Sequence, residues 1–344
     1  MPRELLHWSV AEQALSQLDD AHSAVLRENW GALYVGAMLP DAFYYHRFGS
    51  SPFTFVSEYL HGAEGNDTFA AVRALMEVSA RSSYSDYRPV VHALCFGLVT
   101  HIAADAVFHP MVYYMTGNYY HHDPVEMKNA RTRHRLLETY MDSWATAHHS
   151  AALRTRSLTA AIQQRSGSMA VLSHALQYAI SPRVIAEAQE IPFDAKVPGE
   201  QLWREALGAL CQLQGMFRNP VLGAMLRGVN MLTLGSVRPI DALAAFGRGR
   251  VPEVLEAEME YRNPVTGESA EKSVAVLWEE AVALTVKWWE LLASHIADGI
   301  TETTEIFPAI SGPSLNFGEV GARVDEAIYF SEHGLPMNGL TIQR

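Results

Sequence analysis

The amino-acid sequence predicts an all-α protein, and three observations support this fold class. Apolar residues recur at helical spacing along most of the 344 residues, whereas the alternation that is typical of strands is scarce. About half of the residues (49%) are hydrophobic, which is enough for a sizeable core and argues against disorder. Proline, glycine and aspartate stand between the periodic stretches, where helices begin and end. No repeat of solenoid period is visible.

Four helices are predicted in the N-terminal half. They cover Ser9 to Arg27, Asp67 to Ala80, Val90 to Tyr114 and Asp123 to His148. Ser9 and Asp67 are the expected N-caps of the first two helices. The third is apolar nearly all round, which indicates a buried central helix. Pro124 suits the first turn of the fourth, where its missing N–H costs nothing.

The C-terminal half contains further helices and little chemistry. The predicted helices span Ser168 to Ile180, Gly199 to Met216, Asn219 to Leu232 and Ser273 to Asp298. The third of these is apolar enough for peripheral contact with a membrane, although packing in the core is the alternative. Asn263 to Gly267 predicts a turn between two charged helical stretches. Gly247 to Arg250 and Ser311 to Pro313 mark loops.

Composition excludes some classes of protein. Lys and Arg number 26 against 38 Asp and Glu, a net charge of −12, and no basic tract occurs, so we expect no extended nucleic-acid partner. The two cysteines, Cys95 and Cys211, form either one bridge or two buried thiols, and neither lies at the spacing of a metal motif. The N-terminus has no apolar core of signal-peptide length and no run approaches a membrane span, so we expect a cytoplasmic protein.

Histidine is concentrated where the chemistry is expected. Of 15 histidines, 12 lie within the first 149 residues. His101, Asp105 and His109 recur every four residues, and on a helix they therefore share one face, about 6 Å apart per step. The residues between them are apolar, and three buried ionisable groups need a partner. A divalent metal supplies one, since imidazole and carboxylate are standard zinc donors. A hydrogen-bonded ladder without metal is the alternative.

Three other pieces carry weaker signals. His134 and Glu138 have the i, i+4 spacing that lets two side chains hold one ion, although an exposed His beside a solvated Glu is the alternative. Asp41 lies at the tip of a turn that follows a helix end, where aspartate is also common for purely local reasons. His7 and His61 have no local signature of their own.

Together these motifs resemble the zinc-dependent phospholipase C family, which is related in fold to the S1/P1-type nucleases. The shared order runs over residues 7–138: His7, Gly36-Ala37-x-x-Pro40-Asp41, His61, Gly97-x3-His101-x3-Asp105-x3-His109-Pro110 and His134-x3-Glu138. The resemblance implies a phospholipase C/P1 nuclease-like helical bundle with a helical C-terminal elaboration. Residues 1–150 would form the zinc-binding catalytic core, and residues 151–344 would complete and cover the same domain.

The resemblance also implies a set of ligands for two zinc ions and for a third. One zinc would take Asp41, His61, His101 and Asp105, and a second would take His109, His134 and Glu138. Asp105 would bridge towards a third metal bound by His7. In secreted relatives this third site is completed by an N-terminal Trp, whereas here Trp8 follows His7.

The spacing of the ligands also bears on the reaction. Secreted relatives place five residues between the bridging Asp and the next His, whereas three separate Asp105 from His109. This is similar to the catalytic domain of glycosylphosphatidylinositol-specific phospholipase D. Relatives that prefer choline carry an aromatic residue directly after the turn Asp, and Ala42 stands there in this chain.

These features predict a zinc-dependent phosphodiesterase, C-like or D-like, acting on a phospholipid or another small phosphoester. Asp41 is the carboxylate that we expect to orient or deprotonate the attacking water. Phe43, Tyr44 and Tyr45 form either an aromatic wall for the leaving group or part of the core. The alternatives are an S1/P1-like nuclease or nucleotidase, disfavoured by the acidic balance, and a structural zinc protein, disfavoured because structural zinc sites are closed and rarely clustered.

Overall fold

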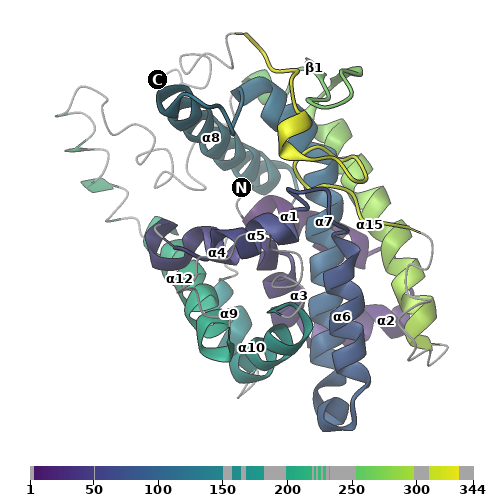
Figure 1. Cartoon of the computed structure of the whole chain (residues 1–344). Helices are drawn as coiled ribbons and strands as arrows, with labels where there is room; N and C mark the ends of the chain where they lie inside the picture. The colour runs from purple at the N-terminus through teal and green to yellow at the C-terminus, as the bar shows by residue number, and fades with distance from the viewer. Residues whose placement is uncertain are drawn as a thin grey trace.

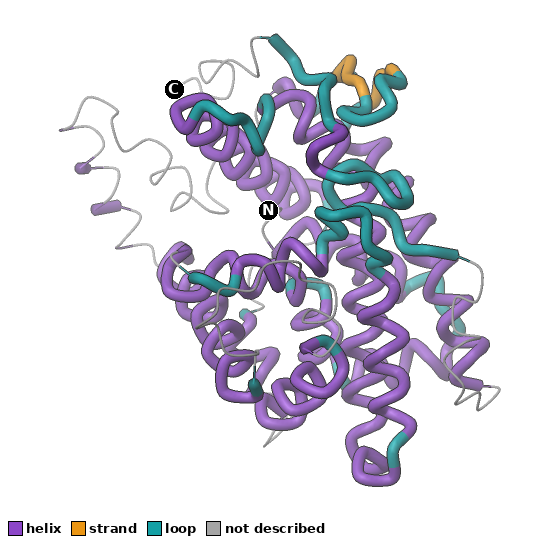
Figure 2. Tube along the Cα trace, in the orientation of Figure 1, coloured by secondary structure: helices purple, strands orange, loops and turns teal. Residues whose placement is uncertain are grey.

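The computed structural model describes residues 4–49, 51–149, 157–163, 168–181, 199–218, 253–297 and 310–332, together with single positions between 221 and 232. Helices dominate this part of the chain (Figure 2). Its strands form one two-stranded hairpin. The predicted all-α class is therefore confirmed. The predicted loop at Gly247 to Arg250 and most of the predicted helix Asn219 to Leu232 lie outside the described residues.

Helix α7 (Arg88–Thr116) is the centre of the molecule, as its apolar sequence predicts. Helices α3 (Trp30–Gly36), α6 (Phe69–Ala80) and α15 (Val274–Ala297) pack against it, and Figure 1 shows α6 and α15 running along it. By length and composition α7 resembles a membrane span, but most of it is buried inside the protein. Its apolar surface is therefore explained by the core.

Two glycines set the closest helix contact. Gly36 of α3 and Gly97 of α7 face each other where the backbones meet, and a Cβ on Gly97 would lie 2.0 Å from the carbonyl oxygen of Leu33. Only glycine allows this approach. The contact places the end of α3, and the turn that carries Asp41, directly against α7.

One predicted helix is two helices in the structure. The stretch from Ser9 to Arg27 divides into α1 (Glu4–Leu15) and α2 (Asp20–Glu28). Asp19 causes the break, because its side chain accepts hydrogen bonds from the N–H groups of Ala21 and His22 and so starts a new helix. Ser9 is inside α1 and caps nothing, so that prediction was wrong.

Six helices remain among the described residues, of which those that begin at Pro124, Ser168 and Glu200 were predicted and the other three were not. The six are α4 (Ala42–Tyr45), α5 (Thr54–Leu60), α8 (Pro124–His148), α9 (Leu158–Gln163), α10 (Ser168–Ala179) and α12 (Glu200–Arg218), with short 3-10 turns η1 (Leu39–Asp41), η2 (His46–Gly49), η3 (Ser82–Tyr87), η5 (Glu253–Leu255) and η6 (Val324–Glu326). Pro124 lies in the first turn of α8, as predicted, and Asp123 caps the helix by accepting the N–H of Val125. Asp67 accepts a hydrogen bond from the N–H of Phe69 at the start of α6.

The charged stretches around Asn263 are strands and not helices. Strands β1 (Met259–Arg262) and β2 (Ser269–Lys272) pair antiparallel, with Met259 opposite Lys272. The turn itself is where the sequence predicts it, and Gly267 takes the left-handed φ of +75° that it requires. Each strand has four residues, which is too short for alternation to stand out among charged side chains.

Residues 310–332, the C-terminal strap, cross the upper part of α7 in Figure 1 as an irregular yellow segment. Its backbone bonds to the chain after α5: the N–H of Leu315 donates to the carbonyl of His61, and that of Val324 to the carbonyl of Ala63. The loop predicted at Ser311 to Pro313 lies at its start. The strap thus covers the region where α5 and α7 meet.

Candidate metal centre

Five elements bring the eight predicted ligands together. His7 comes from α1, Asp41 from η1, His61 from the end of α5, and the remaining five from α7 and α8. All eight side chains are buried, each residue at most 3% exposed. Burial removes three carboxylates and five imidazoles from water. This desolvation is costly unless opposite charges or hydrogen bonds replace the lost water.

The ligand atoms form three groups in which all atoms lie within 4.8 Å of one another. The groups are Asp41, His61 and His101; His7, His101 and Asp105; and His109, His134 and Glu138. The last group contains the residues that the resemblance assigns to one zinc ion, and the first contains three of the four assigned to another, whereas Asp105, the fourth, groups with His7 and His101. The H-x3-D-x3-H spacing on α7 contributes to every group, because its three side chains point the same way from successive turns.

Asp105 lies between the groups. Its Oδ1 is 3.0 Å from Nε2 of His7 and 3.7 Å from Nε2 of His109. Its Oδ2 is 3.0 Å from Nε2 of His101 and 3.7 Å from Nε2 of His61. One carboxylate therefore reaches an imidazole of each group, which is the position of a bridging ligand.

The third group is built on two helices. Nε2 of His134 lies 2.9 Å from Oε1 of Glu138, one turn further along α8. Nε2 of His109, from α7, lies 3.4 Å from the same oxygen. The i, i+4 pair on α8 thus meets the last member of the stripe on α7.

Backbone carbonyls fix the orientation of three imidazoles. Nδ1 of His61 lies 2.7 Å from the carbonyl of Ser57, Nδ1 of His101 lies 2.9 Å from that of Ala37, and Nδ1 of His109 lies 2.7 Å from that of Leu315. A carbonyl only accepts, so each Nδ1 carries the proton and each Nε2 presents a lone pair to the cluster. This is the tautomer and the outer hydrogen bond of a metal-ligating histidine.

Hydrogen bonds within the cluster do not satisfy these groups. Both carboxylate oxygens of Asp41, Oδ2 of Asp105, and Nε2 of His101 and of His109 are buried without a hydrogen bond of acceptable geometry to any described residue. The atoms approach one another but are not aligned as donor and acceptor. Orphaned lone pairs that converge on small volumes fit divalent cations, and the donor set of imidazole and carboxylate fits zinc.

The electrostatics favour ionised carboxylates beside neutral imidazoles at His109 and His134, whereas His101 holds a proton. Burial lowers the pKa of His109 to about 4 and that of His134 well below its ordinary value. Burial opposes the ionisation of Asp105, but His101 and His109 outweigh it and hold its pKa well below the usual range. Burial also acts against a charge on His101, but Asp105 and Asp41 raise its pKa to about 9. A divalent cation would take the place of that proton.

Asp142 is a residue of the site that the sequence analysis missed. It lies on α8, one turn beyond Glu138, and is fully buried. Its carboxylate accepts the N–H of Leu6 over 2.8 Å and that of Leu5 over 3.3 Å. These are free donors of the first turn of α1, so Asp142 ties the helix that carries His7 to the helix that carries Glu138. The i, i+4 spacing from Glu138 is the signal that could have indicated it.

Tyrosines lie between the ligands and solvent. The ring of Tyr44 is 5.3 Å from that of His61, and the ring of Tyr119 is 5.1 Å from that of His134. Both tyrosines are partly exposed, whereas the ligands behind them are not. Phe43 is buried in the core, edge-on to Trp203. The aromatic run after Asp41 therefore divides between a wall of the site and the core.

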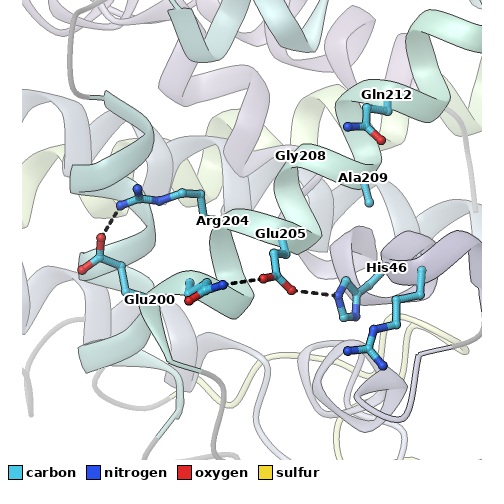
Figure 3. Close-up of a pocket in the computed structure, with 9 residues that line it drawn as sticks. His46, Glu200, Arg204, Glu205, Gly208, Ala209 and Gln212 are labelled. Carbon is cyan, nitrogen blue, oxygen red and sulfur yellow. Dashed lines mark hydrogen bonds and ion pairs between the residues drawn. The ribbon is translucent and has the colours of Figure 1, made fainter.

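Other predicted residues lie apart from this cluster. Cys95 and Cys211 are free thiols, as the alternative to a bridge predicts. A cleft of about 830 Å³ lies between His46, Arg47 and α12. Figure 3 shows side chains that line it, among them His46, Glu200 and Glu205. The cleft contains none of the eight predicted ligands. Most of its charged side chains pair with one another, His46 with Glu205 at 3.6 Å and Arg204 with Glu200, so we assign it no role in the chemistry.

A family comparison decides the relationship of the chain. Residues 6–184, just over half of its length, match the model of the family described as zinc-dependent phospholipase C. The chain belongs to the zinc-dependent phospholipase C family. No curated protein and no solved structure matches it.

Membership in the zinc-dependent phospholipase C family has direct consequences. It makes the chain a zinc-dependent enzyme that hydrolyses phosphoesters, with phospholipid as its substrate class. All eight predicted ligands lie inside the matched residues. The roles of the individual ligands and the number of ions stay predictions.

Proposed function

We propose that this chain is a multinuclear zinc phosphodiesterase that cleaves the head-group ester of a phospholipid. The observation that carries the proposal is the set of three histidines whose Nε2 atoms are turned, by carbonyl bonds at Nδ1, towards Asp41 and Asp105. Structural zinc sites are closed and four-coordinate. Three adjoining ligand groups, two of which share His101 and all of which have an imidazole within 4 Å of Asp105, support an open catalytic site.

The chain's own residues would divide the work of hydrolysis. Zinc, when bound, supplies a Lewis acid that polarises phosphoryl oxygens and acidifies water. Asp41 orients the attacking water and accepts its proton, because its two oxygens are buried beside His61 and His101 and make no hydrogen bond of acceptable geometry to a described residue. The water oxygen forms the new bond to phosphorus, the ester P–O bond breaks, and the proton ends on the departing alkoxide.

Tyr44 and Tyr119 would contact the substrate outside the ligands. Burial raises the pKa of Tyr44 well above its ordinary value, so its hydroxyl stays protonated and can donate. Arg131 donates to the carbonyl of Tyr119 and stacks over its ring at 4.7 Å, which holds that tyrosine in place. Two tyrosine hydroxyls beside the ligand cluster suit a polar head group.

A substrate screen with product analysis tests this function. Zinc-loaded protein would be incubated with phospholipid vesicles, with a soluble phosphodiester and with mononucleotides. We expect hydrolysis of the phospholipid, and the product identifies the bond, because C-type cleavage gives diacylglycerol and D-type cleavage gives phosphatidic acid. Hydrolysis of nucleotides alone, or of none of the three, would contradict the proposal.

A further inference from the structure

The C-terminal strap reaches two predicted ligands through one residue. The N–H of Leu315 donates to the backbone carbonyl of His61 over 2.8 Å, and the carbonyl of Leu315 accepts from Nδ1 of His109 over 2.7 Å. Leu315 is fully buried. His61 belongs to the group of Asp41, and His109 to the group of Glu138. The backbone of one residue in the strap therefore joins two ligand groups.

The next residue of the strap makes a second contact with the same region. Oδ1 of Asn316 accepts the hydroxyl of Tyr113 over 2.8 Å. The ring of Tyr113 lies edge-on to His109 and to His134, with centroids 5.5 Å and 4.8 Å away. Asn316 thus holds the ring that packs against both imidazoles of the third group.

Residues on both sides anchor this part of the strap. The hydroxyl of Thr68, at the start of α6, donates to the carbonyl of Pro313 over 2.9 Å. The side chain of Asn263, in the β-hairpin, donates to the carbonyl of Phe317 over 2.9 Å. The position of Leu315 is therefore fixed from the helical bundle and from the hairpin.

A close approach to α7 completes the arrangement. Pro110 has no N–H, so the helix leaves the carbonyl of Ala106 without its usual partner. Gly318 packs on this carbonyl with a φ of +75°, and a Cβ at Gly318 would lie 2.3 Å from the oxygen of Ala106. The His-Pro pair on α7 therefore creates both the ligand and the surface that the strap covers.

We propose that residues 312–318 are a positioning element of the metal centre and set the metal affinity of the group His109, His134 and Glu138. The carbonyl of Leu315 holds the proton of His109 on Nδ1 and so keeps Nε2 free to bind. This segment lies beyond residues 6–184, where the family match ends. The inference rests on the proposed function only in that these groups bind zinc.

Two glycine variants test the proposal. Gly318 and Gly321 both have a φ of +75°, but a Cβ at Gly321 meets nothing within 4 Å. Gly318→Ala should displace the strap and weaken one zinc site about 10- to 100-fold, the usual cost of losing an outer-shell partner. Gly321→Ala carries the same backbone strain without the clash and should bind zinc like the parent. Zn²⁺ titration of metal-free protein against a chromophoric chelator measures this, and Co²⁺ absorption reports the changed ligand field.

The results of the zinc titration test the role of the strap separately from the proposed function. Equal zinc affinities and Co²⁺ spectra in Gly318→Ala and the parent would overturn the proposal, as would an equal loss in Gly321→Ala. If Gly318→Ala does not fold, Asn316→Ala decides: it should weaken the same site, and Asn316→Asp, which keeps the acceptor oxygen, should restore it. The titration contains no substrate. Normal zinc binding without phosphodiester hydrolysis would therefore refute the proposed function and leave this inference standing.

Discussion

Asp41 is the residue whose proposed role as proton acceptor is most directly tested by a single substitution. Both its oxygens are buried and make no hydrogen bond of acceptable geometry in the described part of the chain, and Nε2 of His61 lies 3.3 Å from Oδ1. Burial acts to raise the pKa of Asp41, but His61 and His101 outweigh it, so its pKa is lowered and the carboxylate is ionised. An ionised carboxylate in this position is able both to hold a metal and to accept a proton.

Asp41→Asn should abolish hydrolysis while leaving the fold and most of the metal in place. The amide keeps one oxygen ligand but is not a base, so we expect a loss of about 10²- to 10⁴-fold in kcat. Steady-state hydrolysis and zinc content of the same preparation are the measurements. Asp20→Asn, on the exposed surface of α2, is the control. Full activity in Asp41→Asn would remove the proposed role.

His134→Ala should cost about one zinc per chain. His134 supplies one of the three side chains of its group, and two remaining ligands hold the ion weakly. His122→Ala, which changes an exposed histidine of the loop between α7 and α8, should retain all the zinc. Metal analysis after dialysis compares the two. Unchanged zinc in His134→Ala would mean that this group is not a metal site.

Helix α7 joins the core to the site. Its glycine contact with α3 fixes the position of Ala37, whose carbonyl orients His101. The same helix carries His92, which is half-buried and whose Nε2 lies 3.2 Å from the hydroxyl of Ser79. The same helix therefore packs the core and carries the predicted metal ligands. Substitutions in its packed part, far from the ligands, should alter both stability and zinc binding.

Gly97→Ala should destabilise the protein and weaken zinc binding together. Its Cβ would lie 2.0 Å from the carbonyl of Leu33 and 2.8 Å from the nitrogen of Ala37. Overpacking of this kind costs about 1–3 kcal/mol and more where backbone must move, so we expect about 3 kcal/mol. Gly208→Ala in α12 meets nothing within 4 Å and should be neutral or slightly stabilising. Urea unfolding distinguishes the two, and equal stabilities would refute the tight contact.

His92 should make the free energy of unfolding depend on pH. Burial lowers its pKa to about 4, below the ordinary 6.5. As pH falls below 6.5 the unfolded chain binds the proton first, so stability decreases until about pH 4 and then levels off. The contribution is up to about 3 kcal/mol, at 1.4 kcal/mol per pKa unit. Urea unfolding of chelator-treated His92→Gln should show a shallower loss between pH 6.5 and 4 than the parent. An unchanged slope would contradict this.

The sequence predicted the helices that carry the ligands better than it predicted the backbone groups that orient the ligand side chains. The periodic spacing of His101, Asp105 and His109 sufficed to place them on one buried face, because helical geometry fixes where such side chains point. The division between α1 and α2 was missed, since the apolar pattern continues across the cap at Asp19. The carbonyls of Ala37 and Leu315 could not be predicted, because every residue has a carbonyl and only the fold selects which ones approach an imidazole.

At the scale of the whole molecule, metal and fold depend on each other. The ligands come from α1, α5, α7, α8 and the turn at Asp41, and the strap from the far end of the chain closes over them. Removing the metal leaves buried carboxylates and imidazoles with unsatisfied atoms. The net charge of −12 should weaken attraction to anionic membranes, so zwitterionic vesicles are the better assay surface.

Chelation should lower the stability of the entire chain. Ligand binding to the native state contributes about 4 kcal/mol per site when free zinc exceeds Kd about 1,000-fold. We therefore expect the Tm to fall markedly in excess chelator and to recover when zinc is restored. A Tm that is the same with and without chelator would indicate that the cluster contributes nothing to the native state.

Anomalous X-ray scattering at the zinc absorption edge, from crystals of the zinc-loaded protein, tests the central claim most directly. The account predicts at least two peaks, one between Asp41, His61 and His101 and one between His109, His134 and Glu138, with Asp105 between them. Absence of a peak at these positions, or a single ion in a closed four-ligand site elsewhere, would contradict it.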